Sequence, residues 1–522
     1  MKLQWILAAA LAAMVNISWA QTLRWASQGD PLTLDPQSQN EGLTNNVNGF
    51  VYERLVRRDR TLAIVPALAT QWQQTGPLTW RFTLRPNVRF HDGAALTADD
   101  VVFSVQRAQL PQGTFAVYAN ALGTPVAIDR NTVEFRLAKV NPVFLQHLES
   151  IFIMNRAWAE KHRVTKPQDF KNKEESYAGF NANGTGPYRL VSRQPGIRTT
   201  FRRNPAWWGT FEGNVQEIVY TPIANDATRL AALVSGEIDF VLDPAPRDVA
   251  RLRGTSGVKV IDGPENRLVF IGMDQFRDEL AYGSLKTKNP FKDLRVRQAL
   301  YHAIDIETIR TKLMNGQSVP TGGLTPSPQG AYNDASLETR LPYDVARARA
   351  LMAEAGHADG FEVTMDCPNN RYINDEEICI ALAGMWAQLK VKVKVNGMPR
   401  SLYFPRLEKF DTSLYLLGWG GAVTDAETTI TPVLRFPADA GVGLFNAGRA
   451  RNETFEKLAV AQGQEADPKK REELVKAALR EYRTQAHIIP LHRQVVPWAA
   501  RSNVEVVHRP DNWLEPTWIT LR

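Results

Sequence analysis

Apolar and polar residues alternate along several short segments of this chain with the period of a β-strand. Within residues 79–84, Trp80, Phe82 and Leu84 alternate with polar residues, which predicts a strand with one buried face. Residues 413–417 (SLYLL), apolar after Ser413, predict a buried strand. Further short strands are predicted at residues 23–26, 132–137, 189–191 and 217–220.

Helical patterns lie between these strands. Thr97, followed three residues later by Asp100, is a capping-box signature for a helix that continues through Val105. A late helix begins after Asp467, with Pro468 at its first position. Other helices are predicted at 45–53, 226–235, 296–305 and 343–356. Helices and strands mixed in this way predict an α/β protein of several lobes.

Several of these segments also match a known family. The run 79–107, TWRFTLRPNVRFHDGAALTADDVVFSVQR, resembles the signature of the family 5 extracellular solute-binding proteins of ABC importers. That family includes dipeptide-, oligopeptide-, glutathione- and nickel-binding members. Residues 184–188 (GTGPY), 203–208 (RNPAWW) and 296–305 resemble further elements of the family, so the resemblance covers nearly the whole chain after residue 20.

The resemblance implies a two-lobed periplasmic-binding-protein fold, type II-like, with an extra subdomain and a ligand cleft between lobes joined by a hinge. A length of 522 residues also exceeds what a single hydrophobic core normally serves. By analogy, the first lobe takes residues 21–66, 183–272 and 497–522, the accessory subdomain 67–182, and the second lobe 273–496.

The first twenty residues have the pattern of a signal peptide. Lys2 is the only charged residue before the apolar run 5–15, and Ser18 and Ala20 are the small residues that a signal peptidase reads. We expect cleavage after Ala20, and the alternative is an uncleaved membrane anchor. The residue directly after the cleavage point is Gln21 and not a cysteine, which favours a free periplasmic protein over a lipid-anchored one.

Composition restricts the function classes. The chain is 44% hydrophobic and 22% charged, which is typical of a folded globular protein. Its formal net charge is +7, but the basic residues are scattered along the chain. A nucleic-acid partner is therefore disfavoured. A monomer is expected.

Two cysteines, Cys367 and Cys379, are an even number in a chain expected to be exported. An oxidising compartment favours a disulfide between them, and the alternative is two buried free thiols. A zinc site is disfavoured, because no histidine lies nearby and two ligands do not complete one.

The predicted strand 413–417 leads into a glycine-rich segment around one tryptophan. This segment resembles the family's pocket sequence, with Trp419 between Gly418 and Gly420 in the position of its ligand-stacking tryptophan. The alternative for Trp419 is a place in the core. Classical peptide binders of the family carry an aspartate where this chain has Ala422. Either Asp425 binds the ligand's amine in place of that aspartate, or the ligand is not a simple peptide with a free N-terminus.

Five more residues lie in loops that face the cleft by analogy with the family. Arg371 has the strongest chemical case among them, because its guanidinium can form paired hydrogen bonds with a ligand carboxylate. The five candidates are Gln28, Tyr118, Arg371, Tyr372 and Asn446.

No enzyme motif for a nucleophile elbow, a zinc protease, a phosphate-binding loop or a dinucleotide fold is present. A turn explains His91 and Asp92 better than acid catalysis does. We therefore expect a non-enzymatic protein without cofactor or metal, whose partners are an inner-membrane ABC permease and a separate ATPase. The expected ligand is a short peptide or peptide-like compound. Alternatives are a nickel-complex, haem or glutathione-type ligand, or a secreted hydrolase.

Overall fold

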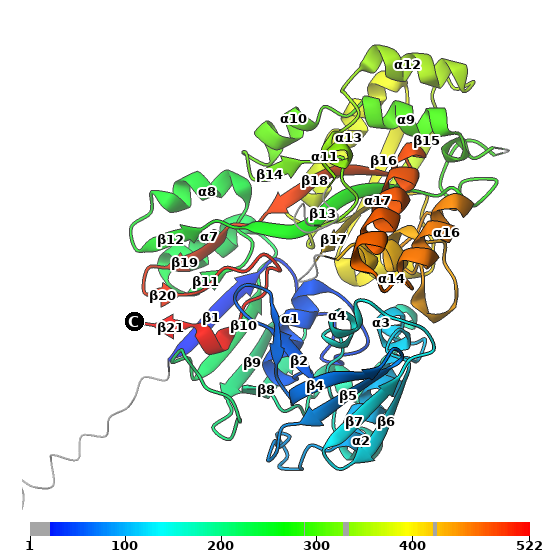
Figure 1. Ribbon diagram of the computed structural model, residues 1–522. Helices are drawn as coiled ribbons and strands as arrows, with labels where there is room; N and C mark the ends of the chain where they lie inside the picture. Colours follow the sequence, from blue (N-terminus) through cyan, green and yellow to red (C-terminus); the bar gives the residue numbers. More distant parts are fainter. Residues whose placement is uncertain (1–20, 287, 327–333, 421–424) are drawn as a thin grey trace, which may run out of the picture.

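The computed structural model describes residues 21–286, 288–326, 334–420 and 425–522, and three sheets organise it (Figure 1). The proposed signal peptide lies outside these residues. No helix within them is long and apolar enough to cross a membrane.

The first sheet has seven strands in the order β12-β19-β11-β1-β10-β9-β8. Trp25 of β1 is fully buried and packs edge-on against Tyr220, with ring centroids 4.9 Å apart. The strands are β1 (Thr22–Ser27), β8 (Tyr188–Gln194), β9 (Arg198–Arg203), β10 (Glu217–Pro222), β11 (Phe240–Val241), β12 (Val258–Ile261) and β19 (Trp498–Arg501), and the helices of this part of the chain are α1 (Gly42–Val51), α7 (Asp226–Ser235) and α8 (Pro246–Arg253). We call this part the first lobe.

The second lobe is built on a six-stranded sheet, β14-β18-β13-β17-β15-β16. Its strands are β13 (Pro264–Met273), β14 (Ser318–Pro320), β15 (Glu362–Pro368), β16 (Lys392–Met398), β17 (Leu414–Gly420) and β18 (Ile488–Val495), and its main helices are α9 (Leu294–His302), α12 (Val345–Glu354), α13 (Asp375–Trp386), α14 (Arg400–Glu408), α16 (Glu453–Gln462) and α17 (Pro468–Thr484). Gly356 follows α12 with φ of 79°, a left-handed conformation that suits glycine at a helix end.

An accessory subdomain contains the sheet β4-β5-β7-β6. The predicted strand is confirmed as β5 (Thr79–Leu84), where Phe82 is fully buried, and the helix after Thr97 is α2 (Ala98–Ala108). The carboxylate of Asp100 accepts a hydrogen bond from the Thr97 amide at 2.9 Å, as the capping box predicts. The other elements are β4 (Ala69–Gly76), β6 (Thr124–Asp129), β7 (Thr132–Arg136), α3 (Ala116–Asn120) and α4 (Phe144–Leu148).

A buried ion pair ties this subdomain to the first lobe. Arg107, in the last turn of α2, donates from Nη2 to Asp35 Oδ2 at 2.6 Å and from Nη1 to Asp35 Oδ1 at 2.8 Å. Both side chains are completely buried. The same guanidinium donates from Nε to the Val164 carbonyl at 3.0 Å and from Nη2 to the Lys166 carbonyl at 2.7 Å.

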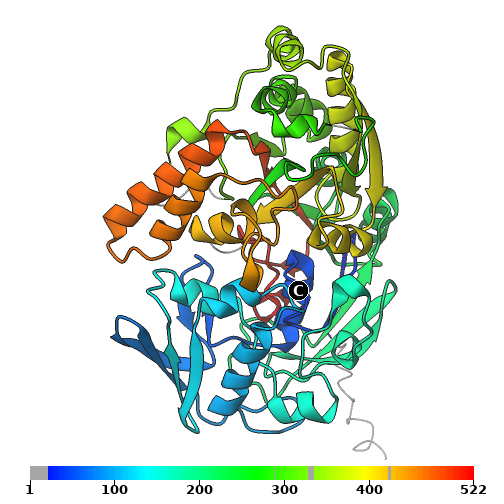
Figure 2. The same ribbon diagram turned by 90° about the vertical axis from the view of Figure 1, so that its right-hand side faces the viewer.

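The chain crosses between the two main sheets twice, and the two crossings are neighbours. One lies between β12 and β13, the other between β18 and β19, and the Val496 amide donates to the Gly263 carbonyl at 3.1 Å across them. Figures 1 and 2 show these strands running from one lobe into the other. The lobe boundary expected at 272 does not fit this sheet pairing, because β13 pairs with β17 and β18 of the second sheet. We therefore propose a boundary at 262–263, while the one expected at 496–497 fits the pairing and stays a proposal.

Candidate functional site

A cavity of about 1130 Å³, which includes space open to solvent, lies between the two lobes. The wall combines aromatic rings with charged side chains. Its aromatic residues are Phe115, Tyr118, Tyr372, Phe404, Trp419, Phe445 and Trp513, and its charged residues are Glu41, Arg54, Glu149, Arg267, Arg371, Arg509 and Asp511. Rings and paired charges are what a site for a polar organic solute requires.

Trp419 lies in this wall, half-buried, at the end of β17. The strand continues through Gly420, three residues beyond the predicted end, because Trp419 is paired with Leu268 of β13. Its indole Nε1 donates to the Thr428 carbonyl at 2.8 Å, and its ring lies 4.7 Å from that of Phe445. The indole is thus fixed in orientation while part of its surface faces the cavity.

The glycines beside Trp419 line the cavity and are required by close packing. A Cβ at Gly418 would lie 2.6 Å from the ring of Tyr372, and one at Gly420 would lie 2.0 Å from the Asn266 carbonyl. Gly418 and Gly420 therefore let neighbouring strands and the Tyr372 ring approach the backbone of β17.

Arg371 lines the cavity and forms part of a charge cluster that joins the two lobes. Glu41, the N-cap of α1, lies 2.8 Å from Arg371 Nε and 3.2 Å from Arg400 Nη1. Burial alone would raise the pKa of Glu41, but Arg400, Arg371 and hydrogen bonds from Thr44 lower it to about 2. The carboxylate is therefore ionised and forms ion pairs with both arginines.

Tyr372 is buried in the wall next to Arg371, and its hydroxyl donates to the Gly418 carbonyl at 3.1 Å. Gln28 donates to the Tyr372 carbonyl at 3.2 Å from the opposite lobe and lines an adjoining cavity, not the main one. Tyr118 lines the main cavity, and its hydroxyl accepts a hydrogen bond from Asn40 at 3.4 Å.

Three of the nine predicted site residues are not in the wall of the main cavity: Gln28, described above, Asp425 and Asn446. Asp425 is buried in an ion pair with Arg471 of α17, at 2.7 and 2.8 Å. Asn446 is buried and donates to the carbonyls of Arg435 and Ala450, both at 2.9 Å. Ala422, the position of the family's aspartate, lies outside the described residues.

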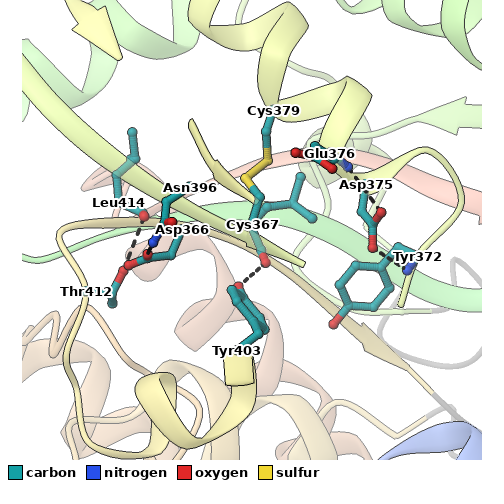
Figure 3. The surroundings of a disulfide bond; sticks show 11 residues. Asp366, Cys367, Tyr372, Asp375, Glu376, Cys379, Asn396, Tyr403, Thr412 and Leu414 are labelled. Atoms are coloured by element: carbon teal, nitrogen blue, oxygen red, sulfur yellow. Dashed lines mark hydrogen bonds between the residues drawn. A yellow bond between two sulfur atoms is a disulfide. The ribbon is translucent and has the colours of Figure 1, made fainter. Parts of the chain in front are cut away.

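A disulfide anchors the segment that carries Arg371 and Tyr372, as the two cysteines predict. Figure 3 shows Cys367, in β15, joined to Cys379 of α13, with Asp375 pointing back toward Tyr372. The Asp375 carboxylate accepts hydrogen bonds from the amides of Arg371 and Tyr372, both at 2.9 Å. Burial raises the pKa of Asp375 to about 7.

Replacing both cysteines by alanine is expected to lower the free energy of unfolding by about 3 kcal/mol, because the unfolded chain is no longer closed into a short loop. Chemical denaturation of the oxidised parent and of the Cys367→Ala/Cys379→Ala variant measures the difference. Equal unfolding midpoints would contradict it.

Most residues of the cavity wall were not predicted, among them Glu41, Arg54, Glu149, Arg267, Arg509, Asp511 and Trp513. They come from segments far apart in the chain, and none stands in a recognisable motif. The sequence offered one signal, a charged residue near an end of the helix predicted at 45–53. It applies to Glu41, four residues before that helix, and to Arg54, directly after it.

The two-lobed fold and its central cavity define a solute-binding protein. The family model described as bacterial extracellular solute-binding proteins, family 5 (middle), matches residues 63–438, and the chain belongs to this family. It is 27% identical to the dipeptide-binding protein of Escherichia coli (strain K12), over 91% of this chain and 89% of that protein. It is 26% identical to the glutathione-binding protein GsiB of Pectobacterium atrosepticum, over 82% and 81%.

Among solved structures, the fold is similar to that of the periplasmic binding protein DppA from Helicobacter pylori in complex with the peptide STSA. The TM-score is 0.85 at 21% identity, with 96% of this chain and 98% of that chain covered. The two-lobed fold predicted from the sequence is thereby confirmed.

Proposed function

We propose that this protein captures a short peptide or a peptide-like compound in the periplasm and delivers it to an ABC permease of the inner membrane, which a separate ATPase powers. The observation that carries the proposal is the inter-lobe cavity, where the fixed indole of Trp419 and the guanidinium of Arg371 line one wall. An aromatic face and a cation suit a ligand with a flat amide backbone and a carboxylate. Cleavage after Ala20, a monomeric state and the absence of a lipid anchor are parts of the same proposal.

Closure on the ligand supplies the signal to the permease. A ligand favours the closed form only by its differential affinity for the closed and open forms. Residues of both lobes line the cavity, Glu41 from the first and Trp419 from the second, so a bound solute gains its full set of contacts only when the lobes are together.

The test is a thermal-shift and tryptophan-fluorescence screen of the purified protein against dipeptides, tripeptides, glutathione, haem and nickel complexes. Native mass spectrometry would identify a ligand that copurifies. Stoichiometric retention of an intact ligand supports the proposal, whereas turnover would indicate a secreted hydrolase.

The variant Trp419→Ala is expected to bind the best ligand of that screen about tenfold more weakly or worse, because a buried aromatic contact is lost. Isothermal titration calorimetry measures the change. Trp72→Ala is the matched control, because Trp72 is a half-buried tryptophan of β4 outside the cavity. Unchanged affinity in Trp419→Ala would remove Trp419 from the site.

A further inference from the structure

Beyond the C-terminal end of α1, Arg54 of the cavity wall and the nearby Arg58 share one carboxylate. Arg54 Nη1 lies 2.7 Å from Glu149 Oε1, and Arg58 Nε lies 3.5 Å from Glu149 Oε2. The side chains of Arg54, Arg58 and Glu149 are 14%, 7% and 9% exposed, respectively. One carboxylate balances one of the two guanidinium groups, so the Arg54–Arg58–Glu149 cluster carries one excess positive charge in a largely buried place.

The two guanidinium groups also hold unused donors. Arg54 Nε, Arg58 Nε and Arg58 Nη2 are buried and have no hydrogen-bond partner. Burial lowers the pKa of Arg54, as do the neighbouring charges of Arg509 and Arg58, while Glu149 opposes the shift. A buried cation with unused donors is costly unless an anion completes its shell.

Arg54 is placed for contact with a ligand. It lines the main cavity and an adjoining one of about 570 Å³, in whose wall Arg58 lies. Its guanidinium lies 4.1 Å from the ring of Phe152 and 4.8 Å from that of Trp513, and Trp513 lines both cavities. The rings hold the guanidinium in place, and a ligand that follows the wall reaches it directly.

The second cationic end lies at the opposite end of α1. Arg371 Nη2 would be 3.1 Å from a Cβ at Gly42, the first residue of the helix. A helix of ten residues is about 15 Å long at 1.5 Å per residue.

The sequence 421–424 carries no ionisable side chain, and Asp425 is ion-paired with Arg471. These residues therefore supply no free carboxylate for a ligand ammonium.

We propose that Arg54 and Arg58 form a second anion-binding subsite, so that the ligand is a peptide-like molecule with a carboxylate at each end, one held at Arg371 and the other at Arg54. This inference rests on the proposed function and narrows its substrate class. The acidic group of the ligand meets Arg54 in the cavity wall, next to Arg58.

The test compares two compounds that differ in one group. N-succinyl-triglycine has a carboxylate at each end and spans about 13 Å, at roughly 3.3 Å per residue, which is close to the length of α1. Its succinamoyl analogue replaces the succinyl carboxylate by a neutral amide of the same shape. Calorimetry is expected to show about tenfold to a hundredfold tighter binding of the dicarboxylate, the range for a charged hydrogen-bonded pair.

In Arg54→Gln this preference for the dicarboxylate over the amide analogue is expected to disappear. The variant should fold, because Arg58 and Glu149 remain as a balanced pair. Arg60→Gln is the control, because Arg60 is an exposed arginine outside both cavities and paired with Glu212, and it should keep the preference.

The outcomes separate the two proposals. If peptides of the earlier screen bind, two results overturn the second subsite alone. One is equal affinity of the parent protein for both compounds, and the other is loss of the preference for the dicarboxylate in Arg60→Gln as well. If no peptide or peptide-like compound binds, the proposed function and the subsite are both wrong.

Discussion

Replacing Glu41 by glutamine is expected to lower the free energy of unfolding of the ligand-free protein by about 3 to 5 kcal/mol, the range for breaking a buried ion pair. Glu41 is 4% exposed and is the carboxylate next to Arg371 and Arg400. Glutamine keeps the shape but leaves two buried guanidinium groups without a counter-charge. Urea denaturation measures the loss, and Glu307→Gln is the control because Glu307 belongs to an exposed ion pair.

The effect of Glu41→Gln has a defined pH dependence. The folded protein lowers the pKa of Glu41 from 4.5 to about 2, so the ionised form is the one that stabilises the fold. This stabilisation is fully present above pH 4.5 and is lost as the pH falls toward 2. The difference between the parent and Glu41→Gln should therefore shrink on acidification from pH 5 to pH 2, and a constant difference would contradict the assignment.

The second large effect is expected for Arg107→Met, again about 3 to 5 kcal/mol, because Asp35 would remain as a buried charge without its partner. Arg107→Lys should recover little. An ammonium cannot reach both Asp35 oxygens and the carbonyls of Val164 and Lys166, which the guanidinium contacts together.

Two controls separate charge from packing. Arg81→Met removes a half-exposed arginine that pairs with Glu134, and it should cost at most about 1 kcal/mol. The double variant Asp35→Leu/Arg107→Met should be more stable than Arg107→Met alone, because no unpaired charge is left in the core. A loss in Arg107→Met no larger than that in Arg81→Met would show that the buried pair contributes little.

The sequence predicted those elements whose signals are local. The helix at 226–235 begins and ends as predicted, because Asn225 caps it and Gly236 ends it with φ of 81°. The strand of Thr79–Leu84 and the helix after Thr97 follow from the period-2 pattern and the capping box in the same way.

Most of the cavity could not be predicted, because its charged groups meet only in the folded chain. Arg54 and Glu149 are 95 residues apart, and Arg371 reaches Glu41 from the other lobe. Proximity along the chain also suggested a role for Asp425 in the site. Its partner Arg471 comes from a helix farther along the chain. That pairing keeps Asp425 buried inside the second lobe and outside the cavity wall.

The two neighbouring crossings between the lobes determine how the protein can move. β12 pairs with β19 on one side and β13 with β18 on the other, and the Val496 amide bonds to Gly263 between them. The lobes are thus joined by two hydrogen-bonded crossings, and we expect motion between them to be concentrated there, because hinges lie at a few residues between packed parts. Both crossings lie in this one connection, so we expect opening and closing to turn the lobes about a common axis. A permease that recognises the closed arrangement of the lobes needs no contact with the ligand.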